Sequence, residues 1–165
     1  MNRRDALYGI GIGALGLAAT RLSGAIPGYR PLSSSFDPDI DLVFSAAPAE
    51  TQVLAGARTR VWRYTGSVVK GPASALQVLP DSFLGPVIRV RRGQRVRIRF
   101  RNDLPEPSIV HWHGLDVPEA ADGHPRLAID RGAEYVYEFE VINRAGTYWY
   151  HPHPHGKPGV RSIKA

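Results

Sequence analysis

This 165-residue sequence predicts an all-β fold, either a sandwich or a barrel, and three observations support that prediction. Short stretches of alternating apolar and polar residues recur along the chain. The clearest runs from Gln94 to Asn102, where Val96, Ile98 and Phe100 share one face. The 17 glycines and 14 prolines favour frequent turns. No stretch of helical period and useful length follows the N-terminal segment, and the length suits one domain with a sizeable core.

The extended segments follow one another at short intervals. We expect strands at 42–47, 51–54, 59–64, 87–91, 94–102, 109–113, 135–141 and 147–151. Pro48 is expected to break the first two apart, because proline lacks the N–H that a sheet ladder needs. Residues 73–79, bracketed by Pro72 and Pro80, could form about two turns of helix within a long loop. Gly93 supplies a turn before the clearest strand.

The second face of that strand is basic. Four arginines alternate with its apolar residues: Arg95, Arg97, Arg99 and Arg101. We interpret this face as solvated, and a surface for an anionic partner is the alternative. Nucleic acid is not an expected partner, because the net charge of +6 falls to +4 (18 basic minus 14 acidic residues) without Arg3, Arg4, Asp5 and Arg21, and no binding motif accompanies it.

The N-terminus resembles an export signal. Arg3 and Arg4 precede a short, weakly apolar run, which is the twin-arginine pattern. We expect a signal peptide over residues 1–25, cleaved after Ala25, and a linker or extended arm over 26–41. The run is shorter than the roughly 20 residues that span a bilayer, so no stable span is expected after cleavage, although an uncleaved anchor is the alternative. The predicted location is periplasmic or extracellular.

All six histidines lie between His111 and His155. In a strand, residues two apart point to the same face, so His111 and His113 project together while Trp112 points away. The same holds for His151 and His153. Two such pairs on neighbouring strands would bring four imidazoles together, and neutral imidazole suits copper, zinc, iron or nickel. The absence of cysteine excludes disulfides, thiolate zinc sites and a blue-copper thiolate.

Two strings around these histidines resemble the copper-ligand motifs of a known family. They are His111-Trp112-His113-Gly114-Leu115-Asp116-Val117-Pro118 with Asp122-Gly123, and Gly146-Thr147-Tyr148-Trp149-Tyr150-His151-Pro152-His153. In this order and these flanks they resemble the N-terminal cupredoxin domain of laccase-like multicopper oxidases. The similarity covers most of residues 41–153. It implies a Greek-key β-sandwich of cupredoxin type over residues 42–155.

The resemblance also implies roles for individual residues. His111 would bind the type 2 copper, and His113, His151 and His153 the type 3 pair. Asp122 matches an aspartate thought to assist proton delivery, with a turn residue before Gly123 as the alternative. His124 has no matching ligand role. His155, two residues past the second pair, is expected to be exposed or to lie behind the ligands, with a contact to the metal as the alternative. We interpret Trp112 and Trp149 as core aromatics that frame the site.

In the family, four further histidines and the type 1 copper cysteine come from a C-terminal domain. Residues 156–165 have no alternating apolar pattern and look like a non-family tail, so the sandwich is expected to be incomplete at this end. The family's partners are dioxygen and a reducing substrate, and another cupredoxin domain or chain would complete the site. Without a type 1 centre, we expect copper binding with little or no oxidase turnover from this chain alone.

Two other functions stay open. Some cupredoxin relatives have lost their coppers and act as non-catalytic scaffold or interaction proteins of the cell envelope. A zinc hydrolase would use three protein ligands and a water, and only Asp116 and Asp122 offer carboxylates close to the clusters in sequence.

Overall fold

The computed structural model describes residues 35–80 and 82–153, and it is built almost entirely of strands. The strands are β1 (Ile40–Thr51), β2 (Thr59–Lys70), β3 (Leu76–Gln77), β4 (Val87–Ile88), β5 (Arg95–Asn102), β6 (Val110–His113), β7 (Glu134–Glu140) and β8 (Trp149–Pro152). Three 3-10 turns accompany them: η1 (Ala73–Ala75), η2 (Glu119–Ala121) and η3 (Pro125–Leu127). The expected all-β class is confirmed. The predicted signal peptide lies outside the described residues.

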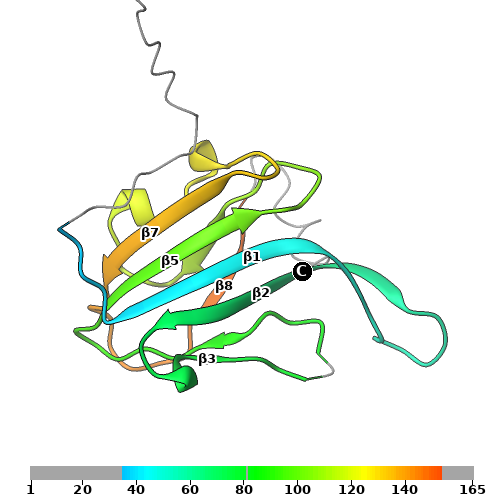
Figure 1. The fold of residues 1–165 in the computed structure, drawn as a ribbon, viewed down its shortest axis with the longest axis horizontal. Helices are drawn as coiled ribbons and strands as arrows, with labels where there is room; N and C mark the ends of the chain where they lie inside the picture. Colours follow the sequence, from blue (N-terminus) through cyan, green and yellow to red (C-terminus); the bar gives the residue numbers. More distant parts are fainter. Residues whose placement is uncertain (1–34, 81, 154–165) are drawn as a thin grey trace, which may run out of the picture.

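One four-stranded sheet, in the order β2-β1-β5-β7, forms the front layer of Figure 1. β1 pairs with β5 in parallel, and the other two pairings are antiparallel. β6 and β8 form a separate antiparallel pair, as do β3 and β4. In Figure 1, β8 passes behind the four-stranded sheet. Within the described residues the sheets do not close around the core.

The core lies between the front sheet and the β6–β8 pair. Val96, Ile98 and Phe100 of β5 are at most 1% exposed, as the alternation predicts. Aromatic rings join the two layers. The ring centroids of Phe44 on β1 and Tyr150 on β8 lie 5.3 Å apart, and the two rings pack edge to face. These contacts fix the β6–β8 pair against the sheet.

The hydroxyl of Tyr137 on β7 is a second tie between the layers. It accepts a hydrogen bond of 2.9 Å from the backbone N–H of Val110, the first residue of β6. Tyr137 is fully buried, and this burial raises the pKa of its phenol well above the ordinary value. The bond therefore fixes the start of β6, one residue before His111.

The N-terminal strands differ from expectation. Pro48 does not break β1, which continues through it to Thr51. β1 pairs with β5 only as far as Ala46. Among the described residues, Pro48 therefore has β2 on one side and no strand on the other, and proline is tolerated in such an edge position. The paired ends of β1 and β2 form the long hairpin that projects from the sheet in Figure 1.

Two further expectations need correction. The predicted two turns of helix over residues 73–79 are a single 3-10 turn followed by β3, which pairs with β4 instead. The arginine face of β5 is not simply solvated. The Arg97 side chain is 12% exposed, and its guanidinium lies 2.7 Å from the Glu138 carboxylate of β7. The ring of Phe36, in the segment before β1, covers the guanidinium of Arg95 at 4.4 Å.

Among residues 35–80 and 82–153, no helix is long and apolar enough to cross a membrane.

Candidate metal centre

The β6–β8 pair brings the predicted histidines together. Its register places His111 directly opposite His151, and His113 opposite Trp149. The side chains of His111, His113 and His151 offer ring nitrogens that all lie within 4.8 Å of one another, close enough to hold one metal ion. Strand alternation puts Trp112 on the other face, where it is 4% exposed and packs edge to face on Tyr137.

His153 completes the cluster from just beyond β8. Its ring centroid lies 4.9 Å from that of His111 and 5.8 Å from that of His151. Its backbone N–H donates to the carbonyl of Ile109 at 2.9 Å, which continues the β6–β8 pairing by one bond. The four histidines in the two predicted pairs therefore lie together on one face of the β6–β8 pair, as the alternation predicts.

Backbone carbonyls fix the tautomers of three of these imidazoles. The Nδ1–H of His111 donates to the Asp122 carbonyl at 2.7 Å, and that of His153 to the Gly123 carbonyl at 3.1 Å. The Nδ1–H of His151 donates to the carbonyl of Pro152 at 2.9 Å. Because a carbonyl only accepts, each ring carries its proton on Nδ1 and leaves the Nε2 lone pair for a metal.

His113 is arranged differently. Its Nδ1 lies 3.3 Å from Nε2 of His151, so these two nitrogens face each other across the pair. Burial is the main cause that lowers the pKa of His151 below the ordinary 6.5, and the neighbouring His111, His153 and His113 add to this effect, while the bond to Pro152 opposes it. The neutral form, the one able to bind a metal, is thereby favoured.

Asp122 ends the turn η2 and lies against the cluster through two groups. Besides its backbone carbonyl, its carboxylate Oδ1 lies 3.4 Å from Nδ1 of His111. The Asp122 side chain is 38% exposed and that of His111 is 19% exposed. The carboxylate therefore reaches both an imidazole of the cluster and solvent.

The other residues that the sequence singled out have different positions. His124 is exposed at the start of η3, where its Nδ1 accepts from the backbone N–H of Arg126 at 3.2 Å. His155 lies outside the described residues. Trp149 frames the cluster but is not a core aromatic, because 53% of it is exposed. Its sequence position gave the signal: two residues before His151, it must share the face of the histidines.

Sequence reasoning missed the backbone carbonyls of Asp122 and Gly123, since backbone acceptors leave no residue pattern. Gly123 has φ of +76° and approaches β6 so closely that a Cβ there would overlap the Val110 carbonyl. Only glycine permits both the conformation and the approach. This turn therefore depends on Gly123 to bring the two carbonyls to the imidazoles.

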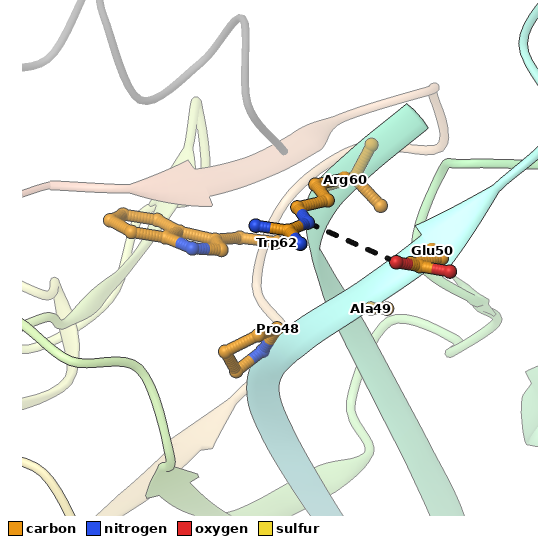
Figure 2. Close-up of a pocket in the computed structure, with 6 residues that line it drawn as sticks. Pro48, Ala49, Glu50, Arg60 and Trp62 are labelled. Atoms are coloured by element: carbon orange, nitrogen blue, oxygen red, sulfur yellow. Dashed lines mark ion pairs between the residues drawn. The ribbon is translucent and has the colours of Figure 1, made fainter. Parts of the chain in front are cut away.

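A pocket of about 550 Å³ lies away from these residues, on the projecting β1–β2 hairpin (Figure 2). It is lined by Pro48, Ala49, Glu50, Arg60, Val61 and Trp62. Glu50 and Arg60 pair across the hairpin at 3.9 Å, with the Arg60 side chain 92% exposed. An ion pair this exposed adds little stability. No histidine of the cluster lines this pocket.

Comparisons with known proteins find relatives of this chain. A family model described as multicopper oxidase matches residues 60–163. The chain is 42% identical over 73 residues to the multicopper oxidase mco of Staphylococcus aureus, a match over 44% of this chain and 16% of that protein. It is 42% identical over 88 residues to copper resistance protein A of Escherichia coli, over 52% of this chain and 14% of that protein.

Solved structures are similar over most of the chain. The McoA multicopper oxidase of Aquifex aeolicus is 34% identical with a TM-score of 0.62, over 78% of this chain and 25% of that chain. A Campylobacter jejuni multicopper oxidase, described as a metallo-oxidase, is 30% identical with a TM-score of 0.59, over 75% of this chain and 23% of that chain. This likeness confirms the cupredoxin-type fold. The chain spans only about a sixth of the first of these curated relatives.

Replacement of Gly123 by alanine should separate the turn from β6. The added Cβ meets the Val110 backbone, so the carbonyls of Asp122 and Gly123 should move away from the two imidazoles. We expect a loss of about 2 kcal/mol or more in the free energy of unfolding, measured by chemical denaturation. Long-range ¹H–¹⁵N spectra should show that His111 and His153 lose their single Nδ1–H tautomer.

Gly132→Ala is the matched control, because Gly132 has φ of +81° with nothing within 4 Å of an added Cβ. It should cost only the strain of a left-handed alanine, about 1 to 2 kcal/mol, and leave the tautomers unchanged. Equal effects of the two substitutions would contradict the role given to the Gly123 turn.

Proposed function

Because this chain belongs to the multicopper oxidase family, we propose that it forms the N-terminal copper-binding domain of an oxidase. The parent reaction would couple oxidation of a reducing substrate to the reduction of dioxygen to water. The observation that supports this proposal most is the clustering of four imidazoles on one face of the β6–β8 pair, two from each of its two chain segments. The proposed domain covers residues 42–155.

The donor set fits copper. Imidazole is a borderline ligand that suits copper in both oxidation states, and the cluster offers no competing thiolate. In this proposal His111 binds the type 2 copper, while His113, His151 and His153 bind the type 3 pair. The carbonyl bonds to Nδ1 support ligation through Nε2 of His111, His151 and His153. When bound, the coppers supply the electrons that reduce dioxygen.

His113 is proposed to bind metal through Nδ1, whereas the other three histidines are proposed to bind through Nε2. Its Nδ1 faces Nε2 of His151 at 3.3 Å, so a metal held by both rings would replace the proton that His113 shares in that bond. The proton can move to Nε2 of His113 on the exposed side of the ring, since His113 is an exposed residue. The other three rings need no such exchange.

Asp122 is proposed as the residue that holds and passes a proton at the edge of the site. A carboxylate 3.4 Å from the His111 ring and partly exposed can take a proton from solvent and hold it beside the cluster. Its backbone carbonyl has the separate task of orienting His111. The two roles depend on different groups, so a side-chain substitution removes only the first.

Completion of the site would need a partner. We propose that another cupredoxin domain or chain supplies four further histidines and the type 1 copper, because these 165 residues contain no cysteine. A non-catalytic scaffold would not need four clustered imidazoles, three of them with tautomers fixed by backbone carbonyls. A zinc hydrolase would need only three ligands with an open position, and here a fourth imidazole, His153, lies beside His111 with 4.9 Å between the ring centroids.

Copper binding is the first outcome to test. The 165-residue chain, produced with copper and zinc both present, should retain copper in preference to zinc. His111→Ala and His151→Ala should each weaken copper binding by about tenfold or more in a chelator competition. His124→Ala is the control, because His124 lies outside the cluster, and it should bind like the original chain. Preferential retention of zinc would contradict the proposal.

Oxidase turnover is the second outcome to test. The copper-loaded 165-residue chain should consume little or no oxygen with a phenolic substrate, because electrons have no type 1 entry point within it. An oxygen electrode measures this directly. Oxygen uptake that disappears in His111→Ala and His153→Ala variants would overturn the need for a partner.

Export from the cytoplasm is the third outcome to test. We propose that residues 1–25 act as a twin-arginine signal and deliver the protein to the periplasm or beyond, on the support of Arg3-Arg4 and the short apolar run that follows. A reporter fused to residues 1–30 should leave the cytoplasm, and replacement of both arginines by lysine should hold it there. A reporter that stays in the cytoplasm would contradict this route.

A further inference from the structure

The four imidazoles are not held in the same way. Three of them donate Nδ1–H to a backbone carbonyl: His111, His151 and His153. Within residues 35–80 and 82–153, the His113 ring makes no hydrogen bond to a backbone carbonyl. Its Nδ1 instead faces Nε2 of the His151 imidazole. It is also the only exposed residue of the four. An exposed, unanchored ring would sample several rotamers and lose this freedom on binding a metal.

Trp149 occupies the position from which His113 can be held. The two residues are directly opposite in the β6–β8 register. Their ring centroids are 4.6 Å apart with an angle of 28° between the planes, which is a stacked arrangement. The indole also lies 4.3 Å from the ring of His151 at 31°. Trp149 thus contacts the two imidazoles whose nitrogens face each other.

Burial does not explain this tryptophan. It is 53% exposed, whereas Trp112, one strand away in the same pair, is 4% exposed in the core. Because burial in the core does not hold the indole ring, its contacts with neighbouring side chains must account for its position. Its ring contacts among the described residues are with His113 and His151.

We propose that Trp149 is a positioning residue, which holds the His113 imidazole by stacking and so replaces the carbonyl anchor that the other three rings have. The stack restricts rotation of the exposed ring and keeps its Nδ1 directed at His151. A ring already in its binding orientation loses less freedom when a metal is bound. This inference rests on the proposed function, since it concerns a ligand of that site.

The test measures Cu²⁺ affinity of the 165-residue chain by chelator competition. Trp149→Leu keeps an apolar side chain but removes the stack, and it should weaken binding by about tenfold, as loss of a ligand-orienting partner does. Trp149→Phe keeps an aromatic ring and should stay within about threefold of the original chain. Phe83→Ala removes another exposed aromatic residue, 44% exposed, and should change nothing. Thermal melts confirm that each variant is folded.

A double-mutant cycle shows whether Trp149 acts through His113. In a His113→Ala background, Trp149→Leu should have almost no further effect on affinity. A full additional loss in that background, or unchanged affinity of Trp149→Leu alone, would overturn the inference while leaving copper binding intact. Failure of the original chain to bind Cu²⁺ would instead overturn the proposed function, and the inference with it.

Discussion

The register between β6 and β8 is the constraint on which the site depends. These strands set His111 against His151 and His113 against Trp149 over only four paired positions. Side chains alternate between the two faces of a strand. A shift of the β6–β8 pairing by one residue would therefore turn the histidines of one strand toward the core and expose the side chains of that strand that are now buried. The chemistry of the site thus depends on a short ladder being paired in one way only.

The opposite face of that ladder secures the register. Trp112 and Tyr150 are directly paired and point into the core, where they contact the front sheet through Phe44. A slipped ladder would expose these rings, and fully burying such a side chain contributes about 1.5 to 3 kcal/mol. The hydrogen bond from Val110 to the buried Tyr137 adds a fixed starting point. Core packing on one face therefore determines ligand geometry on the other.

The sequence was sufficient to predict features that depend on the direction of side chains within one strand. Alternation predicted the buried face of β5 and the shared face of His111 and His113, because side-chain direction in a strand is a local property. It could not supply the Glu138 partner of Arg97, which comes from a strand more than forty residues away. Nor could it show that Pro48 lies in an edge position, since that depends on where β5 ends.

The parallel pairing of β1 with β5 has a consequence for the order in which the domain assembles. β1 is the first strand of the described chain, yet its central place in the sheet requires β5, with Ile40 opposite Val96. Local hairpins cannot build this arrangement, and contacts so distant in sequence are slow to form. The pairing of β6 with β8 requires residues up to Pro152, so during synthesis on the ribosome the histidine-bearing ladder is the last of these pairings to become possible.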